Sequence, residues 1–132
     1  MSEHPVLALI RAKVTDPSRP FVLIADFEAQ PGRGDDVAVA IAASQVVAQT
    51  RAEPGCVAYD LCRAADAPDR FVAYESWRDL ESLRKHLAAP HFAVVGAALG
   101  GLLAAAPAIR VLTSVRSPTS AKPDAAAHSG AS

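Results

Sequence analysis

Alternating apolar and polar residues predict the strands of one small sheet. Residues 21–28, FVLIADFE, are rich in large and β-branched side chains and are followed by a Pro-Gly turn. Residues 56–63, CVAYDLCR, and 70–77, RFVAYESW, alternate on either side of a short polar loop. We expect this pair to form an antiparallel hairpin, with Val57, Tyr59 and Leu61 on one face of its first strand. Alternation from Ile109 to Val115 predicts a last strand.

Apolar residues at helical spacing predict the helices between these strands. A first helix is expected from Asp35 to Arg51, followed by the helix-ending residues Glu53-Pro54-Gly55. Asp79 is placed to cap a second helix through Leu87. Pro90 separates it from a third helix, expected from about His91 to Ala104.

The order strand, helix, strand, strand, helix, strand predicts an α+β fold of the ferredoxin-like, split βαβ type. Its antiparallel four-stranded sheet would carry helices on one face. Val22 and Ile24 make the second face apolar, so we expect a homodimer formed by sheet packing. This domain would span residues 21–115. Residues 1–20 would form an N-terminal arm or an extra strand over Val6–Val14, and residues 116–132, which are small and polar, a disordered tail.

Composition and charge argue against two classes of partner, nucleic acids and membranes. The 132 residues are 51% hydrophobic and 20% charged, with a formal net charge of −1, so nothing attracts the chain to nucleic acid. The most apolar stretch, residues 92–106, falls short of the roughly 20 residues that a membrane span needs. The first residues lack the basic region of a signal peptide. We expect a soluble cytoplasmic protein that binds neither nucleic acid nor membrane.

The two cysteines favour the same compartment. In one extended strand, Cys56 and Cys62 would lie about 20 Å apart at roughly 3.3 Å per residue. A disulfide requires less than about 7 Å between the Cα atoms, so we expect both thiols to stay reduced. Cysteine and histidine spacings typical of zinc sites are absent from the sequence, and no structural metal is expected.

The central third of the chain resembles a known family. Residues 53–63, EPGCVAYDLCR, and 65–92, ADAPDRFVAYESWRDLESLRKHLAAPHF, resemble the antibiotic biosynthesis monooxygenase (ABM) superfamily, which includes quinol monooxygenases. The shared motifs are a Glu-Pro-Gly turn, an aromatic-Glu-x-Trp strand end, and His-Leu followed by Pro-His-Phe. The resemblance implies a dimeric α+β barrel with a pocket between sheet and helices in each subunit.

The resemblance also implies a chemistry. Many members insert oxygen into electron-rich aromatics such as quinols, without metal or flavin, because the deprotonated substrate can donate an electron to dioxygen. The protein then supplies desolvation, positioning and an acid or base. Members that oxidise anthrones or degrade haem pair an Asn on the first strand with a Trp and a His. This chain contains no Asn, which disfavours those two subclasses, and Asp26 or Glu28 is the nearest polar candidate on that strand.

Three residues are candidates for handling the substrate proton. His86 and His91 can accept a proton at neutral pH, and either could instead be an ordinary capping or exposed histidine. Because Pro90 divides them, they do not share a helical face as a two-histidine metal site would, so no metal is expected. Asp26 comes second, since its strand offers no nearby basic residue.

Aromatic residues are candidates for shaping the pocket, although core or cross-strand packing would explain them equally well. They are Trp77, Tyr59, Tyr74 and Phe92. For Glu75 we favour an ion pair over a pocket role, with Arg63, Arg70 and Arg78 as available partners.

The sequence thus predicts a cofactor-independent monooxygenase that oxidises a small aromatic, quinol or phenolic substrate with dioxygen. Two alternatives stay open. A non-oxidative isomerase on the same scaffold would use the same acid or base, and a non-catalytic small-ligand-binding protein would use the same cavity. Consumption of dioxygen separates the first class from the other two.

Overall fold

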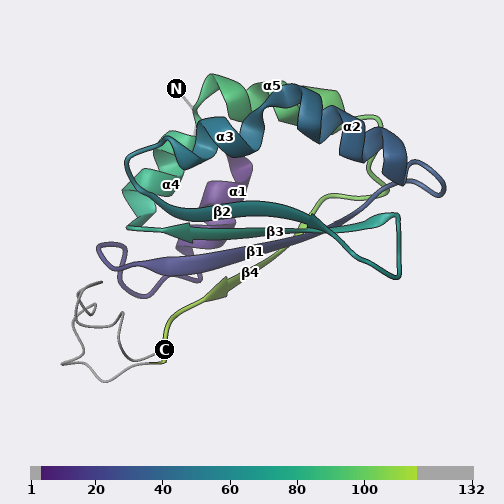
Figure 1. The fold of residues 1–132 in the computed structure, drawn as a ribbon. Helices are drawn as coiled ribbons and strands as arrows, with labels where there is room; N and C mark the ends of the chain where they lie inside the picture. The colour runs from purple at the N-terminus through teal and green to yellow at the C-terminus, as the bar shows by residue number, and fades with distance from the viewer. Residues whose placement is uncertain (1–3, 116–132) are drawn as a thin grey trace, which may run out of the picture.

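A computed structural model describes residues 4–115 of the chain, so the predicted tail at 116–132 lies outside the described residues. The sheet has the order β2-β3-β1-β4, and every neighbouring pair is antiparallel (Figure 1). Its strands are β1 (Phe21–Glu28), β2 (Cys56–Arg63), β3 (Arg70–Trp77) and β4 (Ala108–Leu112). This topology confirms the predicted ferredoxin-like, split βαβ fold.

Helices cover one face of the sheet, which we call the inner face (Figure 1). They are α2 (Gly34–Ser44), α3 (Val46–Arg51), α4 (Leu80–Leu87) and α5 (Pro90–Leu99), preceded by α1 (Pro5–Arg11). The single helix predicted at 35–51 is interrupted at Gln45, whose φ of 62° is left-handed. There the Ser44 hydroxyl accepts a hydrogen bond from the Val46 amide at 3.2 Å. The third predicted helix ends at Leu99, before Gly100 and Gly101.

A β-bulge changes which side chains of β2 face inward. Cys56 lies opposite Trp77, whereas Ala58 lies opposite the next residue of β3, Ser76. The extra residue is Val57, which is 60% exposed. The prediction that Val57 shares a face with Tyr59 is therefore wrong, because simple alternation cannot locate a bulge. Cys56 takes that position instead and packs against the core.

The N-terminal segment is a helix, and the predicted extra strand over Val6–Val14 is wrong. His4 caps α1 through its Nδ1, which accepts from the Val6 amide at 3.1 Å, and Pro5 follows at the start of the helix. Leu7 and Ile10 are three residues apart, so they share one helical face, and each is 1% exposed. Burying two such side chains stabilises the fold by about 3–6 kcal/mol.

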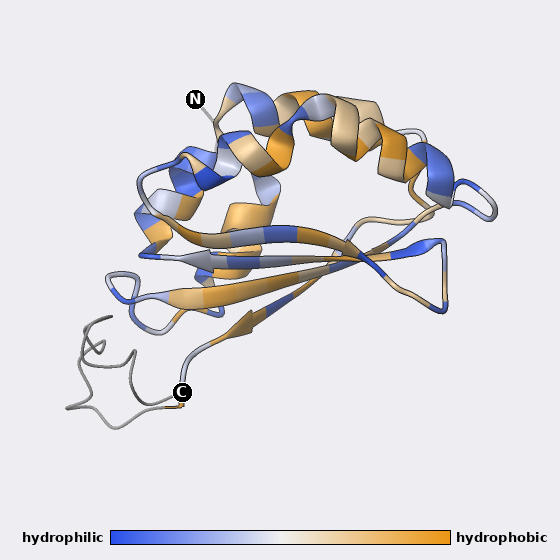
Figure 2. Ribbon diagram, viewed as in Figure 1, coloured by the Kyte–Doolittle hydropathy of each residue, from blue (hydrophilic) through white to orange (hydrophobic). Residues whose placement is uncertain are grey.

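The arrangement of layers fixes where a ligand can approach. Figure 1 shows α1 on the same side of the sheet as α4, and Figure 2 shows that α1, α2 and α5 are largely apolar. The opposite, outer face carries Val22 and Ile24 of β1 with Val72 and Tyr74 of β3. Within the described residues, no helix has the length and apolarity needed to cross a bilayer.

Candidate functional site

Two histidines meet at one carboxylate on the inner side of the sheet. Glu53 lies in the turn between α3 and β2, His86 in the last turn of α4, and His91 in the first turn of α5. Glu53 Oε2 lies 2.7 Å from His86 Nδ1 and 2.6 Å from His91 Nε2. We call these three residues the Glu-His-His cluster.

The junction between α4 and α5 brings the histidines together. Ala88 keeps helical dihedrals, but Ala89 is extended, with a ψ of 146°, and Pro90 starts the next helix. This break turns the chain so that the rings of His86 and His91 lie 5.9 Å apart between centroids. Pro90 therefore does keep them off one helical face, yet they converge on Glu53.

The carboxylate fixes the proton positions of both rings. Each imidazole donates its N–H to Glu53 Oε2, from Nδ1 of His86 and from Nε2 of His91. In the neutral rings, His86 Nε2 and His91 Nδ1 are then left as the proton acceptors. Burial lowers the pKa of His86, which is 1% exposed, against the opposing effect of Glu53. The lowered pKa favours the neutral imidazole of His86, which is the basic form.

Aromatic rings enclose His86. Its ring centroid lies 4.8 Å from that of Trp77, 5.6 Å from Tyr59 and 5.2 Å from Phe92. Trp77 is fully buried and Tyr59 is 6% exposed. Such a wall suits a flat apolar molecule and excludes water from the base.

Glu75 is a second buried acid on the inner face. It accepts a hydrogen bond from Trp77 Nε1 at 2.9 Å and lies directly opposite Tyr59. Burial raises the pKa of Glu75 to about 7, and it likewise raises the pKa of Tyr59. The predicted ion pair for Glu75 is wrong, because strand alternation points it inward beside Trp77. The three arginines considered as its partners pair with acids elsewhere: Arg63 with Asp35, Arg70 with Glu28, and Arg78 with Asp79.

Two predicted site residues lie away from the cluster, on the outer face. Asp26 pairs with Arg110 of β4, with 3.3 Å between Oδ2 and Nε. The expectation that Asp26 lacks a basic neighbour is wrong, because its partner comes from a strand that is distant in sequence. Tyr74 is 43% exposed. The structure therefore brings together His86, His91, Trp77, Tyr59 and Phe92, but neither Asp26 nor Tyr74.

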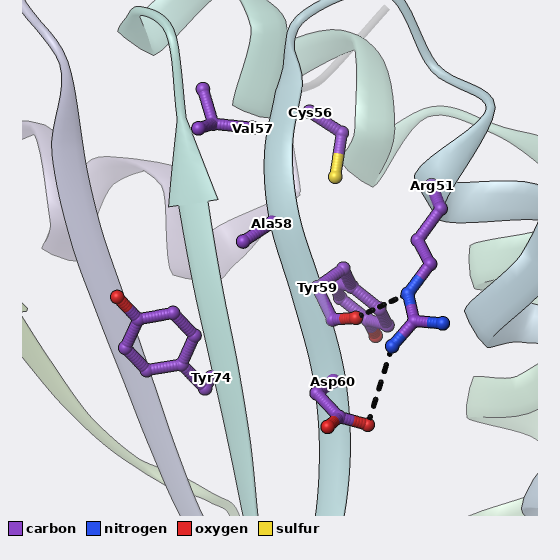
Figure 3. A pocket seen from close by; sticks show the side chains of 7 residues that line it. All are labelled: Arg51, Cys56, Val57, Ala58, Tyr59, Asp60 and Tyr74. Atoms are coloured by element: carbon purple, nitrogen blue, oxygen red, sulfur yellow. Dashed lines mark hydrogen bonds and ion pairs between the residues drawn. The ribbon is translucent and has the colours of Figure 1, made fainter. Parts of the chain in front are cut away.

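An open hollow lies along the edge strand β2, beside Tyr59 (Figure 3). Arg51 extends across it, donating to the Tyr59 carbonyl oxygen at 2.8 Å and pairing with Asp60 at 3.6 Å. Tyr74 borders it from the neighbouring strand. The charges of Arg51 and Asp60 already neutralise each other here, so this hollow offers no base comparable to the cluster.

Among the described residues, the cluster is also the group with metal-ligand geometry. Glu53, His86 and His91 each offer one ligand atom, and these atoms lie within 4.8 Å of one another. Two histidines and one glutamate form a known zinc ligand set, so these residues could hold a divalent ion. The spacing argument against a metal is wrong about the geometry, because the turn at Ala89 brings His91 to the same Glu53 oxygen as His86. In the structure, hydrogen bonds to Glu53 Oε2 already engage one nitrogen of each ring.

Sequence reasoning missed two acids of the site. Glu53 was noted as part of a Glu-Pro-Gly turn, and that motif was the available signal. For Glu75 the signal was the alternation that places it on the same face as Phe71, Ala73 and Trp77.

Comparison with known proteins shows which family the chain belongs to. The family model for antibiotic biosynthesis monooxygenase matches residues 20–97, which is most of the described domain. The chain belongs to the antibiotic biosynthesis monooxygenase family. The residues of the Glu-His-His cluster, together with Glu75 and Trp77, all lie inside the part matched by the ABM model.

Individual known proteins are similar to the chain over most of their own length. Rv0793 from Mycobacterium tuberculosis is 33% identical over 93 residues, covering 70% of this chain and 89% of its own length. The solved structure of PA3566 from Pseudomonas aeruginosa is 32% identical with a TM-score of 0.68, and the match covers 76% of this chain and 98% of that one. A solved family structure from Nitrosomonas europaea, 20% identical over 73% of this chain and 99% of its own, has a TM-score of 0.68 and shares the fold.

Substitution of Gly55 tests how the turn that contains Glu53 packs against α4. A Cβ at Gly55 would overlap the side chain of Ser82, whose hydroxyl is bonded to Asp79 at the start of α4. We expect Gly55→Ala to lower the free energy of unfolding by about 1–3 kcal/mol. Gly96→Ala is the matched control, because nothing lies within 4 Å of its Cβ position in α5, and it should stabilise slightly. Urea unfolding measures the free energy of unfolding of both variants. If Gly55→Ala were as stable as Gly96→Ala, the close packing of Gly55 against Ser82 would be contradicted.

Proposed function

We propose that this protein is a monooxygenase that oxidises a small quinol or phenolic molecule with dioxygen and without a metal or an organic cofactor. The observation that carries the proposal is the buried His86, oriented by Glu53 and enclosed by Trp77 and Phe92. Membership of the ABM family supports it, as does the name of Rv0793, which describes a monooxygenase.

The cluster supplies the proton transfer that such a reaction needs first. His86 Nε2 accepts the phenolic proton, and the Glu53 carboxylate stabilises the imidazolium that forms. Because His86 is buried among aromatic rings, this charge interaction is stronger than it would be in water. His91 is bonded to the same oxygen of Glu53 and so helps to hold the carboxylate in place beside His86.

Dioxygen then reacts with the deprotonated substrate. The phenolate first gives one electron to dioxygen, the resulting phenoxyl and superoxide radicals combine to form a C–O bond at a ring carbon, and the distal oxygen takes up a proton from the imidazolium. The O–O bond breaks as the ring carbon loses its hydrogen, giving a quinone carbonyl and one water. The overall change is one phenol plus one dioxygen to one quinone plus one water, in which the substrate is the reductant.

We also propose that two copies of the chain pair through the outer face of the sheet. Val22, Val72 and Tyr74 lie there, and Leu112 of β4 is 44% exposed beside them. An apolar sheet face of this kind is typically covered by a partner. A second copy would leave the inner face and its cluster undisturbed.

An oxygen electrode tests the reaction directly. Protein dialysed against a chelator should consume dioxygen with a quinol or naphthol above the spontaneous rate, and with ¹⁸O₂ one labelled atom should enter the product. Treatment with the chelator should not change the rate, because the substrate supplies the electrons. Uptake no faster than spontaneous oxidation across the panel would contradict the proposal. Conversion of a substrate without oxygen uptake would favour an isomerase that uses the same base.

A further inference from the structure

We propose that helix α1 occupies a ligand site of this chain, and that a small aromatic molecule with a hydroxyl group competes with α1 for that site. The inference rests on the proposed function, because the hydroxyl group would meet the Glu-His-His cluster. It adds that the described conformation is the closed form, in which part of the chain itself covers the place of the substrate.

Helix α1 lies on the face of the sheet that carries the candidate site. Leu7 and Ile10, each 1% exposed, belong to one buried apolar cluster with residues of three strands and of α4. These include Phe21, Leu23, Tyr59, Trp77, Leu80 and Leu83. Tyr59 and Trp77 are also the rings beside His86. The apolar side chains of α1 and the walls of the candidate site thus form one continuous interior.

The start of α1 reaches the site itself. The His4 ring meets Phe92 edge to face at 5.3 Å between centroids, and Phe92 lies 5.2 Å from His86. Only one ring therefore separates the capping residue of α1 from the proposed base. A molecule that displaces α1 would therefore break this contact beside the base.

The attachment of α1 suits a displaceable element. The helix has only seven residues, a length that is not stable by itself, so its order depends on burying Leu7 and Ile10. The segment 12–20 that joins it to β1 is exposed except for the half-buried Val14. A surface hollow lies between residues 12–20 and α4, and its lining includes Arg11 and Pro17.

Helix α1 also stands outside the shared family domain. The match to the family model begins at residue 20, after α1 ends at Arg11. The match to PA3566 uses 76% of this chain and covers 98% of PA3566. The domain without α1 thus corresponds to the part that the family model describes.

The surface that α1 covers defines the ligand class. It is apolar and aromatic along Phe21, Leu23 and Trp77, and its Trp77 and Tyr59 rings also lie beside His86 of the Glu-His-His cluster. A flat ring system with one hydroxyl group matches this distribution. 1-Naphthol has these properties and serves as the probe.

Hydrogen exchange on the unaltered full chain tests the competition. With saturating 1-naphthol, we expect the amides of α1 to exchange at least about tenfold faster, while those of β1 and β3 keep their rates. Slower or unchanged exchange in α1 would overturn the proposal. Oxygen uptake with unchanged exchange in α1 would support the proposed function and show that this inference is wrong. Faster exchange in α1 without oxygen uptake would support this inference and contradict the proposed function.

Substitution within α1 gives the second test. In the double variant Leu7→Ser with Ile10→Ser, 1-naphthol should quench the single tryptophan, Trp77, with a Kd at least about tenfold lower, because the closed form no longer competes. Leu9→Ser is the matched control, since Leu9 lies on the same helix but is 49% exposed, and its Kd should not change. An unchanged Kd, or no binding, in a folded double variant would overturn the proposal. Should this variant not fold, the exchange experiment decides.

Discussion

Replacing Glu53 with Gln should lower kcat/KM for quinol oxidation on the order of 100-fold while leaving the fold intact. Glutamine keeps the size of the side chain and one hydrogen-bond acceptor. It removes the negative charge that Glu53 Oε2 places 2.7 Å from His86 Nδ1 and 2.6 Å from His91 Nε2. The imidazolium that forms during proton transfer then has no counter-charge in a buried site.

The pH profile separates this role from a structural one. Glu53 raises the pKa of His86, against the burial that lowers it, so its loss must lower the pKa of His86 further. The acid limb of kcat/KM should move to lower pH in Glu53→Gln while the plateau falls. A merely structural role would lower the plateau and leave the limb in place.

Glu81→Gln is the matched control for Glu53→Gln. Glu81 lies on α4, like His86, but it is exposed and bonded to Arg84 at 2.8 Å and 2.6 Å. Its variant should keep both the rate and the pH profile. Equal activity of the Glu53 and Glu81 variants would show that Glu53 does not position the base.

The residues explain why the sequence predicts the fold better than the site. Alternation and helical spacing act over a few neighbours, so they predict the strands and the split βαβ order correctly. Both histidines and Trp77 were recognised, but Glu53, which joins the histidines, lies 33 and 38 residues away along the chain. The partner of Asp26, Arg110, is 84 residues away. Such pairs depend on how turns and strands pack, which local patterns do not contain.

Local patterns were also ambiguous in two segments. The alternation of residues 6–14 fits a strand, yet Leu7 and Ile10 fit one face of a helix equally well, and the inner face of the sheet buries them as a helix. In β2, the bulge at Val57 shifts every later position by one residue. Cys56 and Cys62 consequently lie on opposite faces, as free thiols.

Replacing Glu75 with Gln should make the protein more stable than the wild type at alkaline pH. Burial raises the pKa of Glu75 from 4.5 to about 7, and the opposing hydrogen bond from Trp77 Nε1 does not cancel this effect. Between pH 4.5 and about pH 7, Glu75 has released its proton in the unfolded chain but retains it in the folded chain. The folded state therefore loses stability as the pH rises through this window. The loss amounts to about 3 kcal/mol once the pH exceeds the folded pKa.

Glutamine avoids that loss because it carries no titrating proton and can still accept the Trp77 hydrogen bond through its amide oxygen. Urea unfolding of wild type and Glu75→Gln at pH 4.5 and pH 8.5 should show the stability difference growing in favour of the variant by about 3 kcal/mol. Glu81→Gln, at an exposed position, should show no such gain. A difference that stays constant across this range would mean that the pKa of Glu75 is the same in the folded and unfolded protein, and that burial does not raise it.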